Sequence, residues 1–209
     1  MKKNVIIAIV SVITITNILA QSTLTKKTKM SSKLETATLA NGCFWCTEAI
    51  FQRLNGVEKL TSGYTGGILK NPTYKEITTG KTGHAEAIQI YFNPSIISYQ
   101  EILDVFFSTH NPTTLNKQGY DRGTQYRSAI FYNSIAQKET AEVFINALTA
   151  AKVYKDSIVT EITELDVFYE AEQYHQNYYN NNKTQGYCVA VINPKLEKFI
   201  KKYKSKLKK

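Results

Sequence analysis

The sequence has few cysteines, and it has neither an internal repeat nor a low-complexity segment. Only three of its 209 residues are cysteines, at positions 43, 46 and 188. Three cysteines are too few to hold a fold of this size together through disulfides. We therefore expect them to carry chemistry. Their odd number means that in an oxidising compartment one thiol stays free or the pairs exchange.

The sequence also lacks the clustered ligands of a metal centre. It contains one Cys-x-x-Cys pair, Cys43 and Cys46, and no closely spaced pair of histidines. A four-coordinate zinc site would have to recruit its other ligands singly from distant segments. The available side chains are Cys188, His84, His110 and His175. The sequence therefore predicts no metal, and we also expect no bound organic cofactor.

The body of the chain lacks net charge, although the formal charge of the whole sequence is +9. Lys2 and Lys3 contribute +2 and residues 195–209 contribute +7, so residues 21–194 are neutral in sum. A neutral body offers no basic face for phosphates, which argues against a nucleic-acid partner. In the tail, apolar residues recur at helical spacing, which predicts a lysine-rich C-terminal helix over 193–209 packed on the body.

Residues 1–20 predict a secretory signal peptide. Two lysines precede an apolar run from Val5 to Ile15, and Ala20 offers a small residue at the expected cleavage site. The run is short for a membrane span and contains polar residues, which disfavours the alternative of an uncleaved membrane anchor. We expect export to the periplasm or secretion, without stable membrane insertion after cleavage. Residues 21–33 are polar and predict a tether outside the folded domain.

Hydrophobic periodicity predicts an α+β domain over residues 34–192. The order of its elements predicts a two-layer sandwich, with helices on a mostly antiparallel sheet and a ferredoxin-like βαββαβ core. We expect this domain to be monomeric. Strands are expected at 34–40, 57–64, 85–92, 127–132 and 158–165, helices at 47–54, 98–109 and 134–151 with Ser98 and Ser134 as N-caps, and a loop at 118–125.

The stretch LANGCFWCTEAIF, residues 39–51, places Cys43 and Cys46 around Phe44 and Trp45, the one tryptophan of the chain. Cys43 leaves a strand and enters a helix, where amide hydrogens and the helix dipole stabilise a thiolate. That placement favours Cys43 as a nucleophile over Cys46, which lies one turn into the helix. Two other interpretations stay open from these residues alone, namely a pair of small buried hydrophobic side chains or a redox dithiol.

Further candidate groups lie near glycines elsewhere in the chain. Glu86 begins a strand that is otherwise apolar. A buried carboxyl there, with a raised pKa, could serve as a general acid, while a surface salt bridge is the simpler alternative. Asp121 and Tyr126 lie in a glycine-containing loop, a usual place for active groups. Because the chain has fourteen tyrosines, Tyr126 and Tyr74 are equally well explained by packing.

Taken together, these segments resemble the A-type peptide methionine sulfoxide reductases. The resemblance runs in order from Leu34 to Cys188, so residues 34–192 would form the catalytic domain of such an enzyme. The matching motifs are Gly42-Cys43-Phe44-Trp45, Gly83-His84-Ala85-Glu86-Ala87, Gln118-Gly119 to Arg127-Ser128, Ala171-Glu172-Gln173-Tyr174-His175-Gln176 and Gly186-Tyr187-Cys188. Several separated motifs in the right order are far more specific than a lone Cys-x-x-Cys pair.

The resemblance implies the reduction of methionine S-sulfoxide, free or in oxidised proteins. Cys43 would attack the sulfoxide sulfur and become a sulfenic acid, and Glu86 would act as an acid toward the sulfoxide oxygen. Tyr74 and Tyr126 would hydrogen-bond that oxygen, with Asp121 supporting the arrangement. A second thiol would then form a disulfide, which a thioredoxin-like dithiol would reduce.

The resemblance also assigns the remaining candidates and exposes one departure. Phe44 and Trp45 match an aromatic wall that receives the methyl group on sulfur. Cys188 matches a recycling cysteine, whereas Cys46 replaces a glycine that is commoner in the family. Resolution through Cys188 on a mobile tail is favoured, and resolution through Cys46 or a relay involving both stays open.

Two other functions compete with this interpretation. A general thiol–disulfide oxidoreductase would use the Cys-x-x-Cys pair alone, although nothing else in the chain resembles a thioredoxin fold. A non-catalytic domain that binds methionine-bearing peptides is the second alternative.

Overall fold

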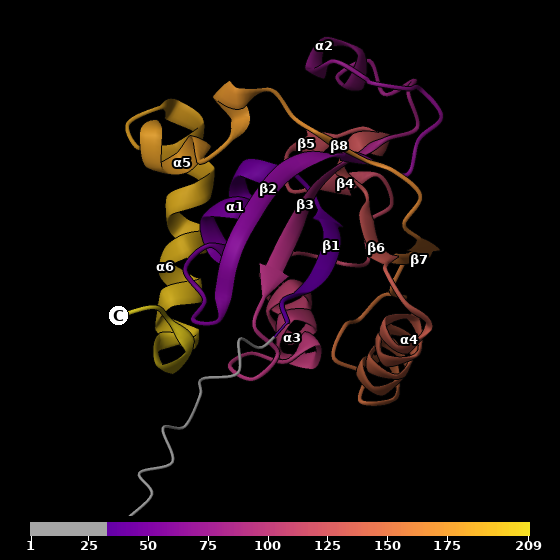
Figure 1. The fold of residues 1–209 in the computed structure, drawn as a ribbon, viewed down its shortest axis with the longest axis vertical. Helices are drawn as coiled ribbons and strands as arrows, with labels where there is room; N and C mark the ends of the chain where they lie inside the picture. Colours follow the sequence, from indigo (N-terminus) through magenta and orange to yellow (C-terminus); the bar gives the residue numbers. More distant parts are fainter. Residues whose placement is uncertain (1–32) are drawn as a thin grey trace, which may run out of the picture. The chain divides into compact units, whose positions relative to one another are not determined.

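A computed structural model describes residues 33–209, which form a mixed α+β fold around a curled six-stranded sheet (Figure 1). The sheet order is β7-β6-β1-β3-β2-β8, and every neighbouring pair is antiparallel except β6 and β7. The predicted α+β class with a mostly antiparallel sheet is therefore confirmed. Its strands are β1 (Glu35–Asn41), β2 (Val57–Thr65), β3 (Ala85–Phe92), β6 (Ser128–Tyr132), β7 (Glu161–Glu164) and β8 (Phe168–Glu170).

Six α-helices and several shorter turns occur in residues 33–209. Ser98 and Ser134 cap α3 and α4 as predicted, since their hydroxyl oxygens accept hydrogen bonds from the amides of Glu101 and Gln137. The helices are α1 (Phe44–Phe51), α2 (Tyr74–Ile77), α3 (Tyr99–Thr109), α4 (Ile135–Ala150), α5 (Tyr178–Asn181) and α6 (Asn193–Lys202). Short 3₁₀-helices cover Thr124–Tyr126, Gln173–His175 and Lys204–Lys206, and a π-helix, Cys188–Ile192, leads into α6.

The predicted signal peptide, residues 1–20, lies outside the described residues, as does all of the predicted tether, 21–33, except Lys33. Within residues 33–209, no helix is long and apolar enough to cross a membrane.

Alternation along β3 separates the two faces of the sheet. Ile88, Ile90 and Phe92 are fully buried in the main core, which also contains apolar side chains of α1, α3 and α6. Ala85 and Ala87, at odd-numbered positions of the same strand, pack on the opposite face with Ala129 and Phe131 of β6. Because side chains alternate along a strand, Glu86 shares the face of Ile88. A carboxyl group therefore stands at the end of an apolar row that points toward α1.

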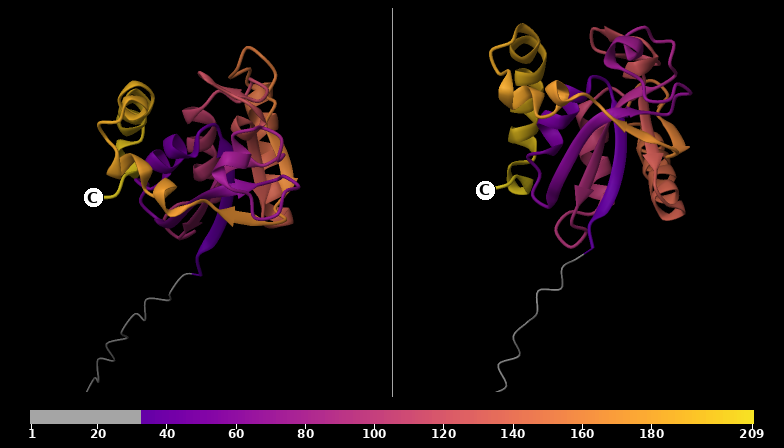
Figure 2. Two further views of the ribbon diagram at one scale, coloured as in Figure 1. Left: turned by 90° about the horizontal axis from the view of Figure 1, so that it is seen from above. Right: turned by 45° about the horizontal axis from the view of Figure 1, so that its top comes forward.

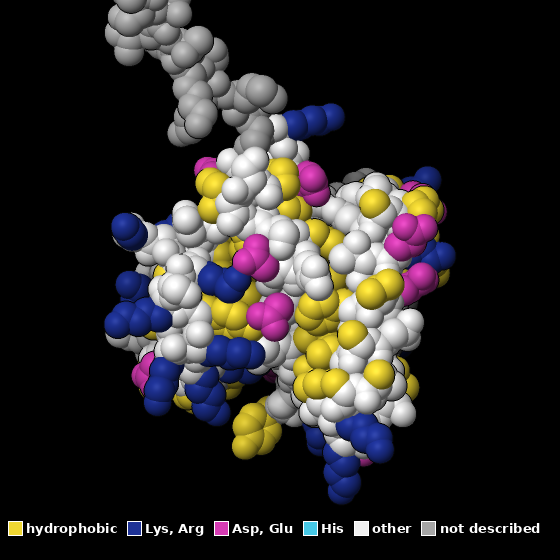
Figure 3. Space-filling model, turned by 90° about the horizontal axis from the view of Figure 1, so that it is seen from below, with side chains coloured by type: hydrophobic (Ala, Val, Ile, Leu, Met, Phe, Trp, Pro, Cys, Tyr) yellow, Lys and Arg dark blue, Asp and Glu magenta, His cyan; other side chains and the backbone are white. Residues whose placement is uncertain are grey.

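The C-terminal segment is packed on this core. Leu196, Phe199 and Tyr203 are buried, and a β-bridge joins Leu54 to Leu207. Helices α5 and α6 both lie beside α1 (Figure 1 and Figure 2). Lys and Arg side chains gather on the side of the molecule where α6 lies (Figure 3). The helical spacing of the apolar residues thus corresponds to a buried stripe with a lysine face in solvent. The predicted helix over 193–209 is too long, because α6 ends at Lys202 and a short 3₁₀-helix, Lys204–Lys206, follows it.

Several short elements differ from the sequence expectation. The predicted strand 158–165 is only Glu161–Glu164 and pairs in parallel at the edge of the sheet. The predicted loop 118–125 contains a hairpin, β4 (Lys117–Gln118) and β5 (Asp121–Arg122). Elements α2, α5 and β8 had no counterpart in the prediction, because segments of three or four residues are too short to show a periodicity.

Candidate active site

A tight turn places Cys43 at the start of α1. Strand β1 ends at Asn41, and Gly42 follows with φ of 100°. A Cβ atom on Gly42 would lie 2.7 Å from Cβ of Gln118, so both the backbone angle and the available space require glycine here. Cys43 is then the N-cap residue of α1. The predicted position of Cys43 at a helix start is confirmed.

Cys43 and Cys46 form a hydrogen-bonded pair of buried thiols. Cys43 is 8% exposed and Cys46 is 5% exposed, and neither is in a disulfide. Burial raises the pKa of Cys43, and its hydrogen bond with Cys46 and the nearby charge of Glu86 raise it further. The same hydrogen bond lowers the pKa of Cys46 to about 7. The pair therefore loses its first proton near neutral pH, so that the two thiols share one negative charge at the start of α1.

Glu86 is a buried acid beside the nucleophile candidate. Its side chain is 2% exposed, and its Oε2 accepts a hydrogen bond of 3.0 Å from the amide of Phe44, the residue after Cys43. Burial raises the pKa of Glu86 to about 8 despite that hydrogen bond. At neutral pH the carboxyl is thus mostly protonated. Oε1, which Phe44 does not occupy, is free to carry the proton.

Two phenols pack against the core cluster that contains Cys43. Tyr74 opens α2, and Tyr126 ends the 3₁₀-helix Thr124–Tyr126. Burial raises the pKa of Tyr74 to about 12, and it raises the pKa of Tyr126 as well. Negative charge on Glu86 and Cys43 raises both pKa values further. Both hydroxyls remain protonated donors at any physiological pH.

Asp121 is tied to the site through a residue for which the sequence suggested no role. The hydroxyl of Tyr187 donates a hydrogen bond of 2.7 Å to Oδ2 of Asp121. The same hydroxyl lies 3.8 Å from Sγ of Cys46. Burial raises the pKa of Tyr187, so the phenol stays a donor. The motif Gly186-Tyr187-Cys188 contained the only signal that could have pointed to it.

Phe44 and Trp45 differ in what they offer to a ligand. Phe44 is only 1% exposed, and its ring packs against Tyr64 and His175. Trp45 is partly exposed and stacks on Tyr178, with ring centroids 3.7 Å apart and planes inclined by 6°. The accessible part of the aromatic wall is therefore the indole, which Phe44 supports from the core.

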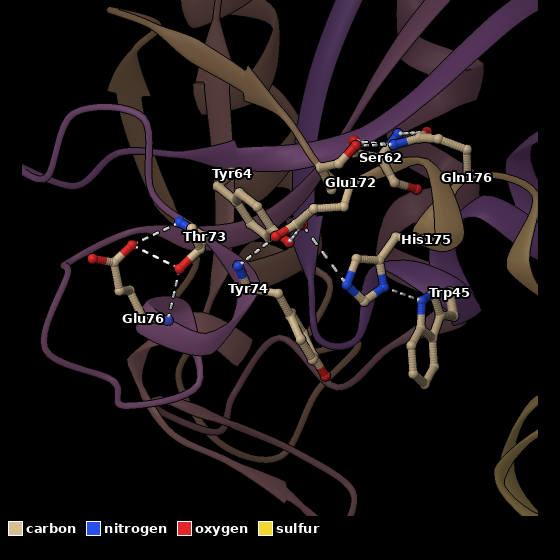
Figure 4. A network of polar contacts seen from close by, with 10 residues as sticks. Trp45, Ser62, Tyr64, Thr73, Tyr74, Glu76, Glu172, His175 and Gln176 are labelled. Atoms are coloured by element: carbon tan, nitrogen blue, oxygen red, sulfur yellow. Dashed lines mark hydrogen bonds and ion pairs between the residues drawn. The ribbon is translucent and has the colours of Figure 1, made fainter.

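The motif Ala171 to Gln176 holds the indole of Trp45 through a hydrogen bond to His175 (Figure 4). Nε1 of Trp45 donates a hydrogen bond of 3.1 Å to Nδ1 of His175. The carboxylate of Glu172 accepts hydrogen bonds of 2.8 Å from the hydroxyl of Tyr64 and from the amide of Tyr74. Sequence reasoning assigned none of these contacts, because they join segments about a hundred residues apart.

The sequence of this site and its fold match one family of enzymes. The model of the family described as peptide methionine sulfoxide reductase matches residues 35–208. The chain belongs to this family.

Relatives of known sequence and structure agree with the assignment. Peptide methionine sulfoxide reductase MsrA from Deinococcus radiodurans is 50% identical over 190 residues, which are 91% of this chain and 92% of that protein. Reduced Mxr1 from Saccharomyces cerevisiae has a TM-score of 0.71 and 36% identity, covering 76% of this chain and 91% of Mxr1. Mxr1 in complex with Trx2 has a TM-score of 0.51 and 28% identity, covering 71% and 86%.

In this methionine sulfoxide reductase the third cysteine is buried close to Cys46. Cys188 is fully buried at the start of the π-helix Cys188–Ile192. Burial raises its pKa, and negative charge on Cys46 raises it further. The segment that follows Cys188, expected to be a mobile tail, is a packed helical segment, and Cys188 is not in a disulfide.

The reductase brings no metal-binding cluster together in residues 33–209. Each of its histidines has a separate set of contacts. His84 accepts from the amide of Gly67 and bonds the carbonyl of Leu69, and His110 lies between the carbonyl of Phe106 and the hydroxyl of Ser128. These rings hold loops and helix ends in place.

Proposed function

We propose that this chain reduces the S epimer of methionine sulfoxide, free or in oxidised proteins, to methionine, with Cys43 as the nucleophile. The observation that carries the proposal is the pairing of Cys43 with a buried, protonated Glu86 through the amide of Phe44. Membership of the family supports the reaction class. Strand order β6-β1-β3-β2, with α1 and α3 in the connections, supports a ferredoxin-like description of the core.

The first step transfers oxygen from substrate sulfur to enzyme sulfur. Cys43, as the thiolate of the pair, forms a bond to the sulfoxide sulfur while Glu86 gives its proton to the sulfoxide oxygen, which is otherwise a poor leaving group. The resulting hydroxyl then moves to the sulfur of Cys43, as its bond to the substrate sulfur and the bond between the two sulfur atoms break. Tyr74 and Tyr126 donate hydrogen bonds to that oxygen as negative charge builds on it. The products are the sulfide and a sulfenic acid on Cys43, so the substrate sulfur is reduced by two electrons and the cysteine sulfur is oxidised by two.

The second step removes the sulfenic acid. We propose that Cys46 reacts first, because it is hydrogen-bonded to Cys43 and its pKa is about 7. Its sulfur bonds to that of Cys43, and the sulfenic oxygen leaves as water. Negative charge on Cys46 raises the pKa of Cys188. The thiolate of Cys188 can then attack the Cys43–Cys46 disulfide and take over one of its two sulfur partners.

The third step returns the enzyme to its reduced form. A thioredoxin-like dithiol reduces the disulfide through a mixed disulfide and is itself oxidised. The complex of the related Mxr1 with Trx2 supports a partner of this kind. Export, cleavage after Ala20 and a monomeric state are part of the proposal, and N-terminal sequencing of the mature protein together with its mass in solution tests them.

Replacement of Cys43 by serine tests the proposal. Cys43→Ser should abolish production of methionine from methionine S-sulfoxide with dithiothreitol as reductant, while circular dichroism shows an unchanged fold. The R epimer and the disulfides of insulin serve as comparison substrates for the wild type. Turnover that persists in Cys43→Ser, or a wild type that reduces insulin but no sulfoxide, contradicts the proposal and favours a general oxidoreductase.

A further inference from the structure

The segment Glu172–Tyr178 connects parts of the chain that are distant in sequence. Gln176 pairs with both backbone groups of Ser62, accepting from the amide at 2.9 Å and donating to the carbonyl at 2.9 Å. The amides of Asn177 and Tyr178 donate hydrogen bonds of 2.6 and 2.9 Å to the buried carboxylate of Glu48. On the other side of His175, Glu172 accepts hydrogen bonds from the hydroxyl of Tyr64 and the amide of Tyr74. The segment is therefore fixed both before and after His175.

His175 lies within this fixed segment and is 1% exposed. Nδ1 accepts the hydrogen bond from Trp45, so Nδ1 is unprotonated and the neutral ring carries its hydrogen on Nε2. Nε2 has no hydrogen-bond partner within residues 33–209, and Oε2 of Glu172 lies 3.9 Å away. Burial lowers the pKa of His175, which keeps the ring neutral at physiological pH.

The imidazole of His175 thus lies beside two candidate site residues, Trp45 and Tyr74 (Figure 4). Its ring centroid lies 5.6 Å from that of Trp45 and 4.3 Å from that of Tyr74. Tyr74 is held a second time, since its amide donates to Glu172 three residues before His175. The position of the indole relative to the phenol is therefore set by two neighbouring side chains of one short segment.

We propose that His175 is a positioning residue that holds the indole of Trp45 relative to Tyr74 and thereby sets the affinity of the site for the methyl sulfoxide group. This inference rests on the proposed function. In the proposed function Trp45 binds the methyl group, which does not change during the reaction, so loss of its support acts on KM more than on kcat. Loss of one hydrogen bond to a buried partner corresponds to about a tenfold rise in KM.

Two substitutions of His175 distinguish its hydrogen bond with Trp45 from the mere packing of its ring. His175→Asn keeps an acceptor at the position of Nδ1, whereas His175→Leu removes it. His110→Asn is the matched control, because His110 is also a buried, hydrogen-bonded histidine but contacts Phe106 and Ser128 instead. We expect KM for methionine S-sulfoxide to rise about tenfold in His175→Leu and to stay within about twofold of wild type in His175→Asn and His110→Asn, with kcat nearly constant.

A double-mutant cycle locates the effect on Trp45. In a Trp45→Phe background the donor is absent, so adding His175→Leu should raise KM no further. An equal rise in both backgrounds overturns the proposal, as does an unchanged KM in a folded His175→Leu variant.

Fluorescence of Trp45, the one tryptophan, reports the contact without substrate. Its emission should change in His175→Leu and be restored in His175→Asn.

If His175→Leu does not fold, acid titration of the wild type serves instead, since protonation of Nδ1 removes the acceptor. Glu172, Tyr74 and Tyr174 are the other titratable groups that face the ring. An emission change in acid that persists in His175→Asn contradicts the proposal. If the emission of the variants changes as described but the wild type reduces no sulfoxide, the proposed function is refuted and the contact of His175 with Trp45 is not.

Discussion

At the scale of single residues, Glu86 shows how burial turns a carboxylate into an acid. Its pKa of about 8 follows from its place at the end of an apolar row of β3. We expect Glu86→Gln to lower kcat/KM by about 10²- to 10⁴-fold, because the amide cannot supply a proton. We also expect wild-type kcat/KM to fall as the pH rises through about 8, and this alkaline decline to be absent in the variant. Pre-steady-state rates of sulfide formation at pH 6 to 10 measure both.

The same burial affects stability with a definite sign. A carboxyl whose pKa is higher in the folded state than in the unfolded chain binds more protons when folded, so its contribution to stability falls as the pH rises from about 4.5 to 8. The free energy of unfolding of Glu86→Gln, minus that of wild type, should therefore increase between pH 5 and pH 8 in urea titrations. A constant difference would contradict a raised pKa.

The two remaining cysteines can be told apart by substitution. We expect Cys46→Ser to stop the condensation with Cys43, so that the sulfenic acid accumulates after one turnover and is trapped by dimedone. Cys188→Ser should still form the Cys43–Cys46 disulfide, with slower reduction by thioredoxin. Mass spectrometry of the trapped species distinguishes the two variants. The reverse pattern would make Cys188 the first resolving residue.

At the scale of elements, the turn between β1 and α1 is the most constrained part of the site. Gly42→Ala imposes both a positive φ and a contact of 2.7 Å with Gln118, and we expect a loss of stability of about 2 kcal/mol or more together with lower activity. Gly119→Ala is a matched control, because Gly119 also has positive φ, 61°, but a Cβ there meets nothing within 4 Å. Thermal unfolding should show the smaller loss for Gly119→Ala. Equal losses would mean that the backbone angle alone matters.

The sequence predicted those elements whose physical signals are local. The strand before Gly42, the helix after Cys43 and the caps at Ser98 and Ser134 all depend on neighbouring residues, and the structure has them. The hydrogen bond of His175 to Trp45 spans 130 residues, and no local pattern specifies it. The sequence left Glu86 open between a buried acid and a surface salt bridge, and the structure buries it. The hydrogen bond between Tyr187 and Asp121 could be found only from the fold.

At the scale of the whole molecule, the C-terminal segment closes the core on the side of α1. Phe199 is 2% exposed in the main core, whereas Ile200 on the same helix is 39% exposed. We expect Phe199→Ala to lower the free energy of unfolding by about 3–5 kcal/mol and Ile200→Ala by much less. Urea titration measures both. Equal effects would contradict the observed packing of α6.

Burial of the catalytic groups has a consequence for the supply of protons. On the proposed cycle, the sulfoxide oxygen leaves as water and therefore needs two protons, which the carboxyl group and the thiols already hold. The reducing partner brings two electrons as two thiols, and each thiol carries a proton of its own. Sulfoxide and dithiol thus become sulfide, disulfide and water with no net proton exchanged with the medium. The buried groups can therefore complete this cycle without a proton channel, and its rate should not depend on buffer concentration.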